Sequence, residues 1–253
     1  MYPIVTPEDF IDLIFNFENL IILAIVFAGG IVRGYTGFGS GLVMVPLFSL
    51  LWSPVDAVAT TVALGQFAAL QLAFSSGKHT NWREVSPMIV ALVCITPLGT
   101  MLLVSLDVDL IKKIIAGLVL FVTAISLRGW QYRGPRGKLP SFIAGAIASF
   151  INGVAAVGGP AIVLYLISLP DRPMIQRANI ASVASLMGFA VLVFTLLSGE
   201  VSYDVLRHTV IFALPYIVSV WCGIGLFKIL PGSAFRLIVL WVLVAISIAI
   251  LLA

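Results

Sequence analysis

The stretch Ile31–Pro46, I-V-R-G-Y-T-G-F-G-S-G-L-V-M-V-P, decides how this chain folds. It lies inside the first long apolar run, yet it carries the charged residue Arg33 and four glycines. A charge costs free energy in hydrocarbon, and glycine weakens the helix that would otherwise satisfy the backbone. The stretch therefore predicts a break inside a membrane-embedded helical element.

The composition of the whole chain is that of an integral membrane protein. Of its 253 residues 61% are hydrophobic and 10% are charged, and the mean hydropathy is +1.16. A soluble domain is about 25% charged. The first ten residues contain acids and no Lys or Arg, which is unlike a cleaved signal peptide. Cys94 and Cys222 lie in apolar runs, so neither a disulfide nor a metal site is indicated, and no cofactor is expected.

Three apolar segments in each half are long enough to cross a bilayer, which takes about 20 residues. They are Val55–Ser75, Val85–Leu106, Leu110–Leu127, Ala178–Ser198, Thr209–Ile229 and Ala234–Ala253. Before each trio lies a broken element made of two shorter apolar pieces. The pieces are Leu20–Val32 and Leu42–Trp52 in the first half, and Phe142–Ile151 and Ala161–Leu169 in the second. Their lengths predict half-helices, either as re-entrant hairpins or as separate short spans.

The two broken elements align without a gap at an offset of 119 residues. The matched positions include Gly34 with Gly153, Gly39 with Gly158, and Pro54 with Pro173. Matched glycines and prolines indicate a duplicated unit. The predicted fold is therefore an all-α integral membrane protein with two repeats, each containing a broken or re-entrant helical element and three transmembrane helices.

The distribution of Lys and Arg predicts the topology. With Arg33 left aside, an odd number of crossings in each half puts ten basic residues on one side and three on the other; an even number gives seven against six. Basic residues prefer cytoplasmic loops, so we expect an odd number and inverted repeats. The predicted parts are a periplasmic segment 1–18, a first repeat 19–128, a cytoplasmic basic linker 129–139 and a second repeat 140–253. The predicted location is the bacterial inner membrane, with multiple spans.

The breaks are expected to form an anion site. Irregular backbone at membrane depth must be buried in protein or line a watery cavity, so the two breaks should meet near the bilayer midplane. A helix begins after each break, and its first N–H groups and its dipole favour an anion. The guanidinium of Arg33 suits carboxylate, sulfonate or phosphate. Alternatively, Arg33 extends to the cytoplasmic surface.

Polar and glycine residues gather around both breaks, although each alone is more often an interhelical contact. The predicted substrate-binding residues are Arg33, Gly34, Tyr35, Thr36, Gly37, Gly39, Ser40, Gly41, Thr60, Gln66, Asn152, Gly153, Gly158, Gly159, Tyr165 and Asn179. All eleven acidic residues lie at segment ends or in loops, which favours a uniporter over a proton-coupled carrier. Sodium coupling through backbone carbonyls stays compatible with this pattern. No catalytic set can be assembled, so an enzyme is not expected.

Two motifs carry a resemblance to a known family. They are G-Y-T-G-F-G-S-G-L-V-M-V-P-L, residues 34–47, and the second copy G-V-A-A-V-G-G-P-A-I-V-L-Y-L, residues 153–166. With these motifs the chain resembles the sulfite exporter TauE/SafE family, also called the four-toluene sulfonate uptake permease family. The resemblance implies an inverted-repeat transporter of sulfite, thiosulfate, sulfonates such as sulfoacetate, or other organic anions. The second copy departs from the family pattern at Pro160, where a third glycine is usual, and at residues 178–180.

The sequence thus predicts a transporter of small anions that exports sulfite or an organosulfonate by alternating access, with uniport favoured. The alternatives are a carrier of another anion, such as carboxylate or thiosulfate, and an anion channel with a fixed pore. The expected partners are a small anionic substrate and the lipid bilayer. No nucleic acid is expected, and the oligomeric state stays open.

Overall fold

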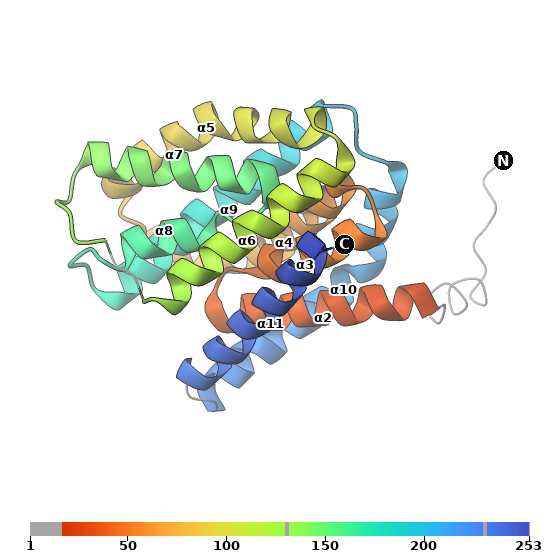
Figure 1. The fold of residues 1–253 in the computed structure, drawn as a ribbon. Helices are drawn as coiled ribbons and strands as arrows, with labels where there is room; N and C mark the ends of the chain where they lie inside the picture. The colour runs from red at the N-terminus through yellow and green to blue at the C-terminus, as the bar shows by residue number, and fades with distance from the viewer. Residues whose placement is uncertain (1–16, 130–131, 230–231, 253) are drawn as a thin grey trace.

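The computed structural model describes residues 17–129, 132–229 and 232–252. Over these residues the chain is helical, with one short 3-10 turn and no strand (Figure 1). The all-α prediction is therefore confirmed for the described part of the chain. The predicted N-terminal segment 1–18 falls almost wholly outside it.

Each half of the chain has the same order of helices: one long, one short, then three long. The first half contains α2 (Phe17–Thr36), α3 (Ser40–Leu51), α4 (Pro54–Ser76), the turn η1 (Gly77–His79), α5 (Trp82–Ser105) and α6 (Val108–Leu127). The second half contains α7 (Lys138–Ala155), α8 (Gly159–Leu166), α9 (Pro173–Leu197), α10 (Tyr203–Ile229) and α11 (Gly232–Leu252). Each of the six predicted long spans coincides with one long helix.

The first arm of each broken element is longer than the sequence predicted. Helix α2 has 20 residues and α7 has 18, and both are among six described helices long and apolar enough to cross a membrane. The other four are α5, α6, α9 and α10. The prediction that Leu20–Val32 and Phe142–Ile151 are short half-helices was therefore wrong.

Glycines that resembled helix breakers are sites of close packing instead. A Cβ on Gly30 would clash with Ser219, and a Cβ on Gly34 would clash with the backbone of Val220. Both contacts are with α10, which lies along α2 (Figure 1). Small residues let membrane helices approach closely, so α2 continues through these glycines.

The second arms, by contrast, are short as predicted. Helix α3 has 12 residues and α8 has 8. The chain leaves α2 through Gly37 and Gly39, whose φ angles of +82° and +95° suit glycine. It leaves α7 through Ala156, at φ +53°. Since Ala156 lies 119 residues after Gly37, both breaks turn through a positive φ at the same repeat position.

Contacts between the helices of the two halves occur in corresponding pairs. Helix α2 packs on α10 as α7 packs on α5, and α10 packs on α4 as α5 packs on α9. Helix α4 also packs on its counterpart α9, and α6 packs on α11 (Figure 1). Swapping the halves turns each of these pairings into another one or into itself, which is the pattern expected of two related copies.

Close contact between α5 and α7 depends on two facing glycines. A Cβ on Gly99 would lie 2.5 Å from the carbonyl oxygen of Phe150 and 3.0 Å from the Cα of Gly153. These neighbours are backbone atoms, which cannot rotate away. The α5–α7 crossing therefore has no room for a methyl group at Gly99.

We predict that Gly99→Ala destabilises the protein by about 1–3 kcal/mol, because the added methyl forces α5 and α7 apart. Thermal unfolding in one detergent measures the effect. Gly117→Ala in α6 is the matched control, since nothing lies within 4 Å of its added Cβ. The control should be neutral or gain about 0.5–1 kcal/mol. Equal unfolding temperatures for Gly99→Ala and the wild type would contradict the packing argument.

Candidate functional site

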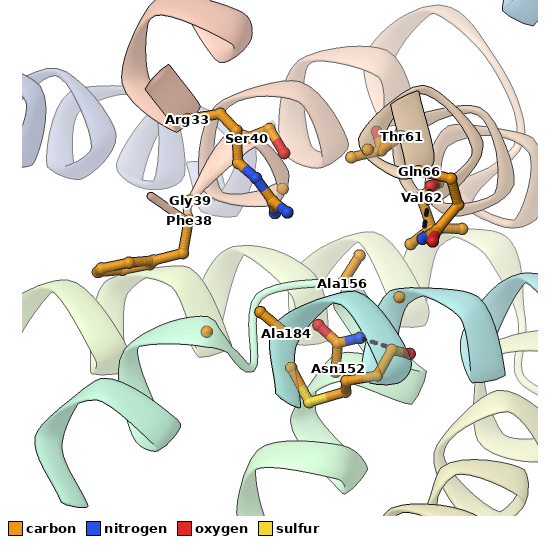
Figure 2. Close-up of a pocket in the computed structure, with 15 residues that line it drawn as sticks. Arg33, Phe38, Gly39, Ser40, Thr61, Val62, Gln66, Asn152, Ala156 and Ala184 are labelled. Atoms are coloured by element: carbon orange, nitrogen blue, oxygen red, sulfur yellow. Dashed lines mark hydrogen bonds between the residues drawn. The ribbon is translucent and has the colours of Figure 1, made fainter. Parts of the chain in front are cut away.

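A small cavity lies where the two breaks meet (Figure 2). Its volume is about 40 Å³. One buried water needs about 10–15 Å³, so the cavity has room for a few waters or a small ion. Its lining comes from both halves of the chain and consists of Arg33, Phe38, Gly39, Ser40, Gly41, Thr61, Val62, Gly65, Gln66, Asn152, Ala156, Gly159, Ala184, Met187 and Gly188.

The two breaks touch each other directly. A Cβ on Gly41, in the first turn of α3, would clash with the carbonyl oxygen of Ala156 in the second break. A Cβ on Gly159, the first residue of α8, would lie 3.0 Å from the ring of Phe38 in the first break. The predicted meeting of the breaks is therefore confirmed, and glycine makes it possible from each side.

Arg33 is the charged residue of the cavity. It lies in the last turn of α2, and its guanidinium points into the space between the two halves (Figure 2). Its Nε is buried and has no hydrogen-bond partner among the described residues, and no described carboxylate forms an ion pair with it. A buried unpaired donor is costly, so the position suits an anionic ligand.

The start of α3 adds backbone donors to the cavity. The N-cap residue Gly39 makes no side-chain cap. The first N–H groups of a helix lack intrahelical partners, and the first two helical residues, Ser40 and Gly41, both line the cavity. The positive end of the α3 dipole therefore faces the same space as Arg33.

The second break contributes less to the cavity. Asn152 lies 119 residues after Arg33, at the equivalent repeat position. Its Oδ1 accepts a hydrogen bond of 3.1 Å from the N–H of Gly158, and its Nδ2 donates to the carbonyl oxygen of Met187 at 3.5 Å. Asn152 thus satisfies a backbone N–H group of its own break, whereas the Nε–H group of Arg33 stays available to a ligand.

Helices α4 and α9 close the cavity from the side. Thr61 is buried, and its Oγ1 has no hydrogen-bond partner among the described residues. Gln66 donates from Nε2 to the carbonyl oxygen of Val62 at 3.3 Å (Figure 2). The α9 wall consists of the small or apolar residues Ala184, Met187 and Gly188.

Seven of the sixteen predicted site residues line the cavity: Arg33, Gly39, Ser40, Gly41, Gln66, Asn152 and Gly159. The other nine lie outside its lining, and several make structural contacts there. Asn179, for example, accepts the backbone N–H of Asn81 at 2.8 Å. The nine are Gly34, Tyr35, Thr36, Gly37, Thr60, Gly153, Gly158, Tyr165 and Asn179.

Eight lining residues were absent from the predicted set: Phe38, Thr61, Val62, Gly65, Ala156, Ala184, Met187 and Gly188. Phe38 and Ala156 lie inside the two breaks, so the motifs themselves could have indicated them. The small α9 residues carry no comparable signal in the sequence.

Comparison with known proteins gives one family match. Residues 21–250 match the sequence model of the family described as sulfite exporter TauE/SafE. The chain belongs to the sulfite exporter TauE/SafE family. Membership implies a multi-pass membrane transporter of sulfur-containing anions rather than an enzyme, and it confirms the resemblance of the two glycine-rich motifs. No curated protein and no solved structure matches the chain.

Tyr165 belongs to a polar network on another part of this TauE/SafE transporter. Its hydroxyl donates to Oε1 of the buried Glu84 at 2.9 Å, and Arg136 Nε donates to Oε2 at 2.6 Å. The Arg136 fork also pairs with Asp171, at 3.1 and 3.3 Å. The hydrogen bond to Glu84 raises the pKa of Arg136 above its usual value, so the guanidinium stays charged. The network ties α5, the central linker and α8 together.

We predict that Tyr165→Phe lowers stability by about 1–3 kcal/mol, because Glu84 loses a donor in a buried position. Binding of a small anion such as sulfite in the cavity beside Arg33 should stay unchanged, since Tyr165 does not line that cavity. Thermal unfolding and sulfite binding by the same purified protein measure both effects. Tyr203→Phe is the control, because Tyr203 is 96% exposed. Weaker sulfite binding by a fully stable Tyr165→Phe variant would instead place Tyr165 in the substrate site.

Proposed function

We propose that this transporter exports sulfite, or a small organosulfonate such as sulfoacetate, across the bacterial inner membrane by alternating access. One observation carries the proposal. The buried Nε of Arg33 has no hydrogen-bond partner in the described part of the chain, and the Arg33 side chain points into a cavity between the two breaks. A single small oxyanion would satisfy both the charge and the free donor.

The anion would be held by groups from the first half of the chain. Arg33 would donate charge-assisted hydrogen bonds, the N–H groups at the start of α3 would bind a second oxygen, and the hydroxyl of Thr61 would bind a third. Asn152 and Gly159 would shape the opposite wall. The small volume favours sulfite or a compact sulfonate head group over a bulky substrate.

Alternating access would arise from the relation between the halves. The corresponding helix contacts of the two halves support two repeats, 19–128 and 140–253. The distribution of Lys and Arg supports their inverted orientation. The basic linker 129–139 would then lie in the cytoplasm. Rocking of one repeat against the other would move the contact of Gly41 with Ala156 and open the cavity to each side in turn.

Uniport is the mode of transport that requires no coupling-ion site in this cavity. The fifteen residues that line the described cavity include one cation and no carboxylate. An inside-negative potential drives an anion outward by about 2.3 kcal/mol per charge for each 100 mV. Export would therefore need no proton-binding residue in the cavity.

Efflux from proteoliposomes at a set membrane potential tests the proposed function. Sulfite, sulfoacetate, a carboxylate and phosphate are compared, and counterflow is measured for each. We expect potential-driven efflux of sulfite or sulfoacetate with trans-acceleration. Absence of trans-acceleration would indicate a channel, a required proton or sodium gradient would overturn uniport, and selective carboxylate transport would overturn the sulfur-anion substrate.

Replacing Arg33 tests the binding site itself. Arg33→Ala should weaken sulfite binding by about 2 kcal/mol or more, because the anion loses a desolvated charge partner. Arg33→Lys keeps the charge without the planar fork and should lose less. Equilibrium binding to the purified, folded variants measures the difference. Wild-type affinity in Arg33→Ala would show that the guanidinium does not contact the substrate.

A further inference from the structure

A second cavity lies away from the two breaks, where α5 and α7 begin. Its volume is about 370 Å³, much larger than that of the cavity beside Arg33. Two segments far apart in sequence form its wall: the start of α5, with Arg83 and Glu84, and the residues Arg136, Gly137 and Lys138 at the end of the linker. The proposed transport site uses none of these residues.

The charged residues that line this cavity are mostly basic. Arg83, Arg136 and Lys138 contribute three cations against one carboxylate, that of Glu84. Both oxygens of Glu84 are already occupied by Tyr165 and Arg136. When Asp171, which pairs with Arg136 from outside the lining, is counted too, one positive charge remains in excess. No described ion pair compensates Arg83 or Lys138.

Arg136 is held rigidly at the cavity wall and still has donors to offer. Its bonds to Glu84 and Asp171 use three N–H groups, and a guanidinium has five. The N-cap residues of α5 and α7, Asn81 and Gly137, also line the cavity and make no side-chain caps. The positive ends of two helix dipoles therefore reinforce the basic side chains.

Exposed apolar side chains lie directly beside the basic ones. Trp82 precedes Arg83 and is 50% exposed, while Leu139 follows Lys138 and is 69% exposed. Further along the same two helices, Val90 and Ile143 are also exposed. Helices α5 and α7 run side by side from this point (Figure 1). A ligand with an anionic head and an apolar tail would match both surfaces.

We propose that this cavity binds the phosphate of an anionic phospholipid, with the acyl chains lying along the exposed surface of α5 and α7. Arg83, Arg136 and Lys138 would donate to the phosphate oxygens, and Trp82 would lie at the headgroup level, where tryptophan is enriched. Basic pockets between membrane helices attract anionic headgroups of the nearby leaflet. The site does not depend on which anion is transported.

The test compares lipid binding by the full-length protein in detergent. Phosphatidylglycerol and phosphatidylcholine are titrated, and bound lipid is counted by native mass spectrometry. The wild type should prefer phosphatidylglycerol. The double variant R83Q/K138Q should lose this preference by about fivefold for each charge removed. The matched control K112Q/K113Q removes two basic residues from the start of α6 and should keep it.

An unchanged preference in R83Q/K138Q would overturn the proposal, and so would an equal loss in K112Q/K113Q. Inorganic phosphate at the same concentration forms a third arm. If inorganic phosphate displaces bound phosphatidylglycerol as effectively as added phosphatidylglycerol does, the cavity is a site for a free anion and not for a lipid. Since Arg83 and Lys138 are exposed, the double variant R83Q/K138Q should fold. If it does not, the single variants R83Q and K138Q decide the question, and each should lose about fivefold in the preference for phosphatidylglycerol.

Discussion

Hydrogen bonding of the backbone inside a bilayer is the constraint on which the rest of this structure depends. The breaks that end α2 and α7 leave backbone N–H and C=O groups without intrahelical partners, and lipid could not satisfy them. The chain covers each break with the other one. Gly41 lies against the carbonyl of Ala156, and Gly159 lies against Phe38. Both contacts need glycine. The glycines therefore account for the close packing of the two breaks and for the small size of the cavity between them.

The two breaks have similar backbones, each with a positive φ, but their side chains differ. Arg33 and Asn152 occupy equivalent positions, but the amide of Asn152 binds the N–H of Gly158 while Nε of Arg33 binds no described residue. One half therefore stabilises its own backbone and the other offers a charge. A cavity with a single cation between two such halves suits a single small anion, which agrees with membership in the TauE/SafE family.

The sequence predicted the halves and the meeting of the breaks, because glycines and prolines recur at one offset and buried irregular backbone must be covered. It did not predict the length of α2. A sequence does not distinguish a glycine that breaks a helix from one that lets two helices cross. The neighbours that identify Gly30 and Gly34 as crossing residues, Ser219 and Val220, lie far along the chain. For the same reason the sequence around Tyr165 did not indicate its hydrogen bond to Glu84, which lies 81 residues earlier in the chain. The α9 wall was missed because small apolar residues carry no chemical signal.

The most direct measurement of the central claim is the position of a bound anion. Selenite resembles sulfite in shape and charge, and its selenium atom can be located by anomalous scattering in crystals of the full-length protein. We expect a selenium peak between the guanidinium of Arg33 and the first N–H groups of α3, against the second break. A peak elsewhere in the protein, with the cavity beside Arg33 free of selenium, would contradict it.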